Sequence, residues 1–157
     1  NNKLFENYDA RYLVSYYNNS HNDFNGAIIQ IKLPTFPYNL TDISYINNDV
    51  RYFSINVIDL SSPKQTIQTI SDSELIKHAD NNNITTIYLT CHNSSSINLQ
   101  LYPPSSIKKC NNIIHYFGVL YRQLLPQFKY EIPNLTYASN NTLRHFMQDY
   151  YPLIYWL

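Results

Sequence analysis

Apolar and polar residues alternate in several short runs of this chain, and turn-forming residues separate the runs. Residues 27–33, 52–58, 84–91 and 97–101 all follow this pattern. A period of two places alternate side chains on the buried face of a β-strand and the others on its wet face. About eight such runs, spaced roughly 8 to 12 residues apart, are typical of all-β proteins. The sequence therefore predicts an antiparallel β-sandwich or jelly roll.

Two regions of the chain are less regular. Residues 66–70 and 75–76 are expected to be short strands on either side of a turn at residues 71–73, where small polar side chains favour a local reversal. Residues 113–125 form a longer apolar run, which fits either one long strand or two. Both regions extend the β-structure along the chain.

One segment near the C-terminus has the periodicity of a helix. Within residues 141–150, apolar side chains recur at helical spacing at Leu143, Phe146, Met147 and Tyr150. Pro152 lies just beyond this segment, in the place where a proline commonly follows a helix end. We therefore expect one short C-terminal helix.

Glycine is scarce in this chain, which has only 2 glycines, Gly26 and Gly118, among 157 residues. Phosphate-binding loops, dinucleotide fingerprints and the nucleophile elbow of α/β-hydrolases each need two or more glycines within a few residues. Sites built on these glycine-rich loops are therefore excluded. Because Asn tolerates a left-handed backbone better than most other residues, we expect it to fill many of the turns.

Charge and length limit the partners and the domain count. The 11 basic residues balance 11 acidic ones and are scattered, so no basic patch for a nucleic acid is predicted. No apolar run approaches the roughly 18 residues of a membrane helix, so no membrane span is expected. The length fits one domain. We predict a single sandwich over residues 1–157, with residues 1–20 and 141–157 as possible assembly arms.

Two features indicate a secretory route. Six Asn-x-Ser/Thr sequons for N-glycans lie in or beside breaks between apolar runs, at Asn18, Asn39, Asn83, Asn93, Asn134 and Asn140. A bond between Cys91 and Cys110 would stabilise the fold by about 3 kcal/mol. Chance sequons in an Asn-rich chain and two reduced core cysteines are the alternatives. The chain begins at Asn1 without Met, as either a fragment or a mature product without its leader would, and these two features favour the mature product.

Several short motifs follow one another along the chain: a strand at residues 29–34, VRYFSI at residues 50–55, a strand at residues 85–89 and VLYRQLLP at residues 119–126. This arrangement resembles the β-sandwich family called domain of unknown function 1214, often paired with the 1254 domain in exported or envelope proteins. The resemblance spans about residues 26–133. It implies a sandwich and an extracellular location. It implies no catalytic site, because the family offers no residue-level chemistry to carry over.

Candidate catalytic and metal-binding residues are few. His145 and Asp149 lie four apart on the predicted helix, a spacing that suits two metal ligands. Asp72 and Glu74 lie two apart, as a carboxylate pair for acid–base work would. We interpret the first pair as a solvated helix face and Asp72 as a turn cap, since no further ligand lies nearby in the sequence. The sequence thus predicts no catalytic residue, metal or cofactor.

Aromatic residues are the strongest functional signal. The 16 tyrosines, 7 phenylalanines and single Trp exceed what one small core requires, and Tyr and Trp concentrate at contact surfaces. They crowd both ends of the chain, and an ordered apolar end either packs on its own domain or adds a strand to a neighbour's sheet. The residues expected to mediate assembly are Tyr12, Tyr16, Tyr151, Tyr155 and Trp156.

The expected function is therefore that of a structural protein. We predict a secreted subunit of an extracellular filament or surface coat, whose partner is a second copy of itself. A contact between unlike surfaces of two copies propagates into a filament unless it closes into a ring. The alternatives are a carbohydrate-binding module that uses exposed aromatic rings and, third, a hydrolase-like enzyme.

Overall fold

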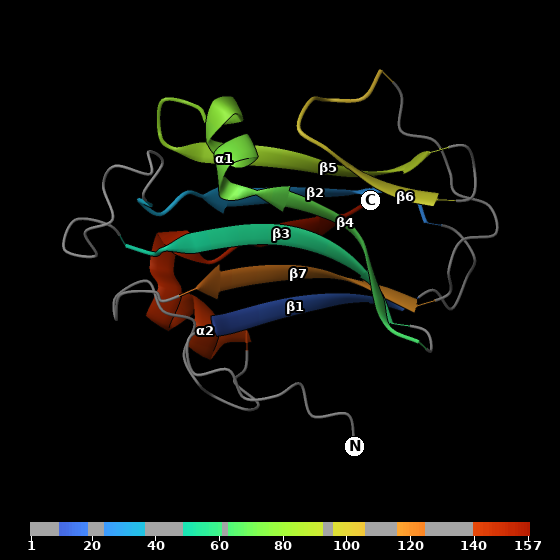
Figure 1. Cartoon of the computed structure of the whole chain (residues 1–157), viewed down its shortest axis with the longest axis horizontal. Helices are drawn as coiled ribbons and strands as arrows, with labels where there is room; N and C mark the ends of the chain where they lie inside the picture. Colours follow the sequence, from blue (N-terminus) through green and yellow to red (C-terminus); the bar gives the residue numbers. More distant parts are fainter. Residues whose placement is uncertain are drawn as a thin grey trace.

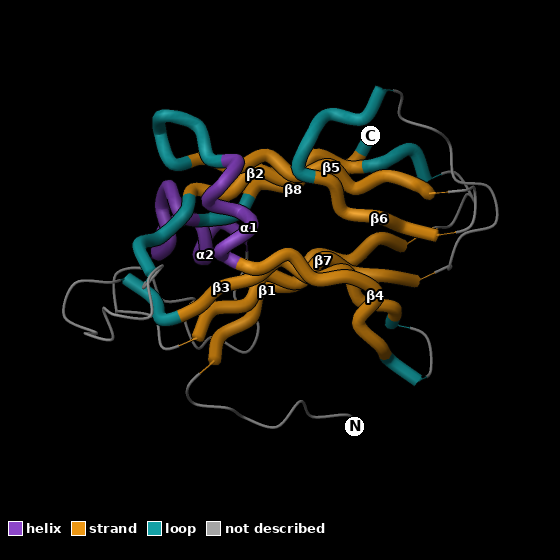
Figure 2. Tube along the Cα trace, turned by 45° about the horizontal axis from the view of Figure 1, so that its top comes forward, coloured by secondary structure: helices purple, strands orange, loops and turns teal. Residues whose placement is uncertain are grey.

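The chain folds into two antiparallel sheets that face each other as two layers (Figures 1 and 2). The computed structural model describes residues 10–18, 24–36, 49–60, 63–92, 96–105, 116–124 and 140–157. Within these residues each sheet has 4 strands, in the order β1-β7-β3-β4 and β6-β5-β2-β8. Every pairing between neighbouring strands is antiparallel. The predicted all-β sandwich is thus confirmed.

The strands and helices have the following bounds. The strands are β1 (Ala10–Asn18), β2 (Ala27–Lys32), β3 (Tyr52–Asp59), β4 (Gln65–Ser71), β5 (Ile84–His92), β6 (Ser96–Gln100), β7 (Tyr116–Leu124) and β8 (Leu153–Trp156). The helical segments are α1 (Asp72–Leu75), η1 (Ile76–His78), α2 (Asn140–Met147) and η3 (Gln148–Tyr150).

The core lies between the two sheets, and the predicted alternation places its side chains there. In β2 the exposure alternates regularly, and Ala27, Ile29 and Ile31 are buried. In β3, Phe53 and Ile55 are fully buried as predicted. Each fully buried Ile or Phe side chain contributes about 1.5–3 kcal/mol relative to an exposed one. The alternating apolar residues therefore account for both the sheet faces and the stability of the sandwich.

The alternation fails on the outer face of β3, where two polar residues are also buried. Ser54 and Asn56 are almost inaccessible to solvent. The Nδ2 group of Asn56 donates hydrogen bonds to Ser54 Oγ at 3.1 Å and to the carbonyl oxygen of Leu120 at 3.4 Å. Thr69 Oγ1 donates to Asn56 Oδ1 at 2.7 Å. This network satisfies the buried amide, whose burial would otherwise destabilise the fold.

The strand predicted at residues 75–76 is wrong, because these residues belong to α1 and η1. Glu74 lies three residues after Ser71, and its Oε2 accepts a hydrogen bond from Ser71 N at 3.2 Å. This arrangement starts a helix and satisfies a free N–H at its end. Leu75 is fully buried, and its carbonyl accepts a hydrogen bond from Thr85 Oγ1 at 2.8 Å. The hydrogen bond at the start of α1 therefore favours a helix over the strand that the two apolar residues predicted.

The predicted C-terminal helix is confirmed as α2, followed by η3. Met147 is buried, as the periodicity predicted, but Phe146 on the predicted apolar face is 54% exposed. The helix lies at one end of the sandwich, beside the ends of β1 and β7 in Figure 1. After Met147 the backbone leaves the helix, and Gln148 has a positive φ of 48°. The helix therefore offers the core a narrower face than its sequence suggested.

Candidate functional site

The two flanks of the sandwich, where the sheets end, differ in how they are closed. On one flank β4 lies beside β6, and the side chain of Gln68 reaches the backbone of Leu99. Gln68 Nε2 donates to the Leu99 carbonyl at 3.0 Å, and Leu99 N donates to Gln68 Oε1 at 2.6 Å. A register shift between Val57 and Ile58 in the β3–β4 pairing marks a bulge beside Gln68, and bulges commonly redirect a side chain. We call this pair of hydrogen bonds the amide clamp.

The opposite flank is formed by β1 and β8, which are the end strands of the two sheets. Leu60 N donates to Tyr116 O at 3.1 Å, which continues the register of β3 with β7. Antiparallel ladders alternate, so even-numbered residues of β7 bond to β3 and odd-numbered ones bond to β1. The β1–β7 register then turns the N–H and C=O groups of Tyr12, Val14 and Tyr16 away from β7. In the described part of the chain, no strand pairs with this edge.

The free edge of β1 has few of the features that normally prevent pairing with another chain. The strand is 9 residues long and contains neither Pro nor Lys, and Arg11 is its one charged residue. Natural edge strands are usually short, charged, bulged or covered. On the flank formed by β4 and β6, by contrast, the amide clamp occupies the backbone N–H and C=O groups of Leu99. Of the four end strands β1 is the longest, and its edge is therefore suited to strand addition.

Exposed tyrosines lie along this edge and form what we call the β1 tyrosine patch. Tyr12, Tyr16 and Tyr116 are 37%, 56% and 43% exposed, respectively. The rings of Tyr16 and Tyr116 stack with an interplanar angle of 11° and a centroid separation of 6.2 Å. Tyr16 lies opposite Gly118 in the register, and a Cβ at Gly118 would lie only 3.3 Å from Val14 Cγ1. The missing side chain therefore leaves room for Val14 and Leu60 beside the patch.

The structure places the five predicted assembly residues in different surroundings. Tyr12 and Tyr16 belong to the tyrosine patch, and Tyr155 in β8 is 49% exposed. Tyr151 is half-buried, and Trp156 is packed against the core, with Tyr17 at a centroid separation of 5.2 Å. Within the described residues, both chain ends thus pack on their own domain through β1–β7 and β2–β8 pairing. Their role in assembly stays a prediction.

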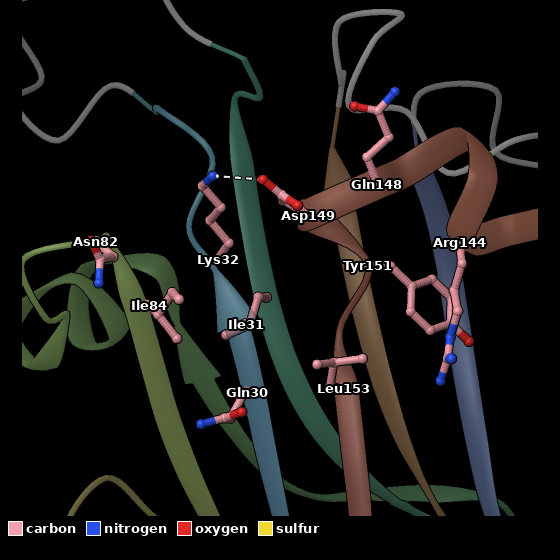
Figure 3. A pocket seen from close by; sticks show the side chains of 10 residues that line it. All are labelled: Gln30, Ile31, Lys32, Asn82, Ile84, Arg144, Gln148, Asp149, Tyr151 and Leu153. Atoms are coloured by element: carbon pink, nitrogen blue, oxygen red, sulfur yellow. Dashed lines mark hydrogen bonds and ion pairs between the residues drawn. The ribbon is translucent and has the colours of Figure 1, made fainter.

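Among the described residues, two cavities lie near the flank formed by β1 and β8. The first, of about 690 Å³, is lined mainly by polar residues from β2, the β5 entry and the C-terminal helix (Figure 3). Lys32 Nζ forms an ion pair with Asp149 Oδ2 at 3.2 Å there. The Arg144 guanidinium lies 5.4 Å from the centre of the Tyr151 ring, so one face that a sugar would stack on is occupied. The Tyr151 ring in this cavity is therefore poorly placed for the carbohydrate-binding alternative.

The second cavity, of about 320 Å³, lies between the sheets and is named the inter-sheet cavity. Core residues from both sheets reach it, and α2 contributes to its rim. The described residues that line it are Leu13, Val14, Ser15, Ile29, Ile55, Val119, Tyr121, Asn140, Leu143, Arg144, Tyr151, Pro152, Ile154 and Trp156. The sequence pattern does not predict this cavity, because its walls come from segments far apart in the chain.

The predicted sequons and cysteines are only partly described. Asn83 is exposed in a turn, with a left-handed φ of 59°, and Asn140 is exposed at the start of α2. Asn18 ends β1, and its side chain is not described. Cys91 is half-buried in β5. The remaining predicted residues, Asn39, Asn93, Asn134 and Cys110, lie outside the described residues, so the glycans and the disulfide stay predictions.

The described residues offer little that resembles a catalytic centre. No group of three or more His, Cys, Asp or Glu side chains that could hold a metal occurs in the described stretches. Asp149 pairs with Lys32. Asp72 accepts hydrogen bonds from Phe53 N at 3.3 Å and Ser73 N at 2.7 Å, and burial raises its pKa. Its two backbone partners give this carboxylate a structural role at the start of α1.

Comparison with known proteins gives no relative for this chain. None of the helices in the described part is both long and apolar enough to cross a membrane. No protein-family model, no curated protein and no solved structure matches the chain. The resemblance to the exported β-sandwich family therefore stays a prediction.

Proposed function

We propose that this protein is a secreted, N-glycosylated structural subunit that assembles with copies of itself into an extracellular filament or surface coat. The observation that carries the proposal is the free edge of β1. This edge is 9 residues long, lacks Pro and Lys, and has no strand beyond it among the described residues. Assembly through such an edge needs no cofactor and no rearrangement of the core.

Strand addition would be stabilised by backbone hydrogen bonds and by burial of tyrosine rings. A neighbouring strand that pairs with β1 gains hydrogen bonds to the outward groups of Tyr12, Val14 and Tyr16, each with a net contribution of about 0.5–1.5 kcal/mol. The tyrosine patch lies on the same strand and its neighbour β7. Tyrosine rings bury a large area with little loss of side-chain entropy. The backbone hydrogen bonds and the burial of tyrosine rings both favour association at the β1 edge.

The secretory part of the proposal is supported by where the described sequons lie. Asn83 and Asn140 are both exposed, so each can carry a glycan without disturbing the core. Intact-mass measurement of the secreted protein before and after enzymatic deglycosylation tests this directly. For a control, Asn83→Gly removes one sequon without straining the backbone, because glycine accepts the φ of 59° at this position. An unchanged mass after deglycosylation would contradict a glycosylated surface protein.

The assembly proposal is tested by blocking the outer edge of β1 at its centre. Val14→Pro removes an N–H that faces away from β7, a position where edge strands tolerate proline. Val14→Ala is the matched control, because it shortens the same side chain and keeps the N–H. We expect the wild-type protein and Val14→Ala to sediment faster as concentration rises, and Val14→Pro to remain monomeric.

A second edge variant covers the case in which proline prevents folding. Val14→Lys keeps the backbone groups but adds a charge of the kind that protects natural edge strands, and circular dichroism checks that each variant is folded. Negative-stain electron microscopy then shows whether the assemblies are filaments or sheets. A wild-type protein that stays monomeric at millimolar concentration, or a folded Val14→Pro that assembles normally, would falsify the proposal.

A further inference from the structure

We propose that β1 pairs with β1 of a second copy of this chain, antiparallel about a two-fold axis at Val14, so that two four-stranded sheets join into one. The inference rests on the proposed function, because it names the partner of the same β1 edge. Three observations support it: the obstacles at the other end strands, the way the β1 edge matches itself, and the position of its one charge.

Among the described residues, the other end strands have obstacles that β1 lacks. β8 has only 4 residues and β6 has 5, and the amide clamp occupies the backbone N–H and C=O groups of Leu99 in β6. At the end of β4, Ser71 N donates to Glu74 Oε2 at 3.2 Å, so this N–H group is also occupied. Short or occupied edges offer few hydrogen bonds to an incoming strand.

β4 is 7 residues long, but its bulge disturbs the spacing that a partner strand needs. Even-numbered residues of β3 bond to β7, so the β4 residues opposite Asn56 and Ile58 turn their backbone groups outward. These residues are Thr69 and Thr66, which lie three positions apart because of the bulge. The outward residues of β1 are two positions apart throughout the strand. β4 therefore does not match the β1 edge in register.

β1, the outermost strand of its sheet in Figure 1, matches a second β1 over its whole length. When the two copies of Val14 lie opposite each other, Tyr12 of each copy lies opposite Tyr16 of the other, and all 9 residues have a partner. The outward backbone groups of these three residues then face each other, and each such pair exchanges two hydrogen bonds. Any shift of this register leaves residues unpaired at one end of each strand. The register at Val14 therefore gains the most hydrogen bonds.

The side chains of this register also fit each other. Tyr12, Val14 and Tyr16 project from the same face of β1, because alternate residues of a strand share a face, and none of them is fully buried. Directly opposed side chains have Cβ atoms about 4.5–5.5 Å apart. Each Tyr12 ring therefore meets a Tyr16 ring, which already stacks on Tyr116 of its own copy. The pairing thus extends the β1 tyrosine patch across the boundary between the two copies.

The one charge in β1 distinguishes antiparallel from parallel pairing. Arg11 is the only charged residue of the strand. Parallel pairing in register would place the two Arg11 side chains next to each other, which is destabilising. In the antiparallel register each Arg11 lies opposite Tyr17 of the other copy, and the two Arg11 positions lie at opposite ends of the paired strands. The antiparallel pair therefore brings no like charges of β1 together.

A contact of this kind uses the same surface on both copies and therefore closes on itself. The β1 edges of both copies are then covered and recruit no further chain. In a filament or coat the two-fold pair is the repeating unit, and growth beyond two copies uses a second surface.

Charge exchange at Val14 tests whether the two Val14 residues meet. In Val14→Lys and in Val14→Glu, like charges lie directly opposite each other, so each variant alone should associate about tenfold more weakly than the wild type. An equimolar mixture places opposite charges at the axis and should associate about tenfold more tightly than either variant alone. Sedimentation equilibrium measures the dissociation constants, and circular dichroism checks that each variant is folded.

A mixture of Tyr12→Lys and Tyr12→Glu is the matched control, because the two Tyr12 positions do not meet in the proposed register. Mixing these two variants should give no gain in affinity. A mixture of Tyr12→Lys and Tyr16→Glu should gain affinity, since Tyr12 of one copy lies opposite Tyr16 of the other. This second mixture replaces the Val14 mixture if the Val14 variants do not fold.

The outcomes separate this inference from the proposed function. If the wild-type protein stays monomeric, both fail. If the wild type associates but neither the Val14 mixture nor its replacement binds more tightly than its components, β1 pairs with another segment and only this inference fails. Undiminished association of Val14→Lys or Val14→Glu alone, or an equal gain in the Tyr12 control mixture, also overturns this inference.

Discussion

Replacing Gln68 with Glu tests the amide clamp, because this change alters one hydrogen bond and preserves the shape of the side chain. Gln68 currently accepts from Leu99 N at 2.6 Å and donates to Leu99 O at 3.0 Å. An ionised Glu at this position still accepts from the Leu99 N–H. It has no proton for the Leu99 carbonyl, and it places a negative oxygen against it.

The magnitude follows from these two contacts. Loss of one net hydrogen bond and repulsion at the carbonyl should lower the free energy of unfolding of Gln68→Glu by about 1–3 kcal/mol at neutral pH. In a chain of this size each 1 kcal/mol corresponds to roughly 2–4 °C in melting temperature. Protonation of the new carboxyl restores the donor, so the fold should raise the pKa of this group above the usual value near 4.3. The stability of the variant relative to wild type is therefore highest below that value and is lost as pH rises through the folded-state pKa.

Chemical denaturation of the wild type and the variant from pH 3.5 to pH 7 measures this difference. Gln65→Glu is the matched control, because it adds the same charge to the same strand at an exposed position. We expect Gln65→Glu to follow the wild-type pH dependence within about 0.5 kcal/mol. A stability difference between Gln68→Glu and wild type that does not change with pH would refute the role given to the clamp.

Two further predictions concern the core and a turn. Burial raises the pKa of the Asp72 carboxyl, so the folded state binds the carboxyl proton more tightly than the unfolded state does. The stability of the wild type relative to Asp72→Asn should therefore fall as pH rises above the ordinary pKa of Asp. Equal pH dependence of the two proteins in chemical denaturation would contradict this. Gly26 has a φ of 119° and its carbonyl accepts a hydrogen bond from Leu157 N at 2.9 Å. Gly26→Ala should therefore lower the free energy of unfolding by about 1–3 kcal/mol, as thermal melting would show, and an unchanged melting temperature would disprove the strain.

The sequence predicted those strands whose two faces differ in polarity. In β2 the alternation of Ile29 and Ile31 with Gln30 and Lys32 is clear, because one face is core and the other meets solvent. In β1 the alternation of apolar and polar residues is not clear. Tyr12 and Tyr16 point outward while Tyr17 packs against the core, and tyrosine is compatible with both environments. The pairing of β1 with β7 depends on contacts between residues 98 to 114 positions apart.

The candidate sites were predictable only in part. The assembly residues Tyr12 and Tyr16 follow from their number and position in the sequence, and the structure adds that they lie on an edge. The amide clamp joins residues 31 positions apart, and neither Gln68 nor Leu99 belongs to a motif. The inter-sheet cavity is lined by residues from β1, β2, β3, β7, α2 and β8, and a local sequence pattern does not record which distant segments meet. Distant pairings of ordinary residues therefore limit prediction from one sequence.

The amide clamp also leads to an expectation about how the sandwich moves. The β4–β6 flank is held by hydrogen bonds to the backbone, whereas side-chain contacts such as Trp156 against Tyr17 hold the opposite flank. Thermal fluctuations should therefore separate the two sheets least at the β4–β6 flank and most at the β1–β8 flank. Amide hydrogens near Leu99 are then expected to exchange last among the edge strands, and those of β8 first. The clamp makes the flank that contains the cavity the more dynamic one.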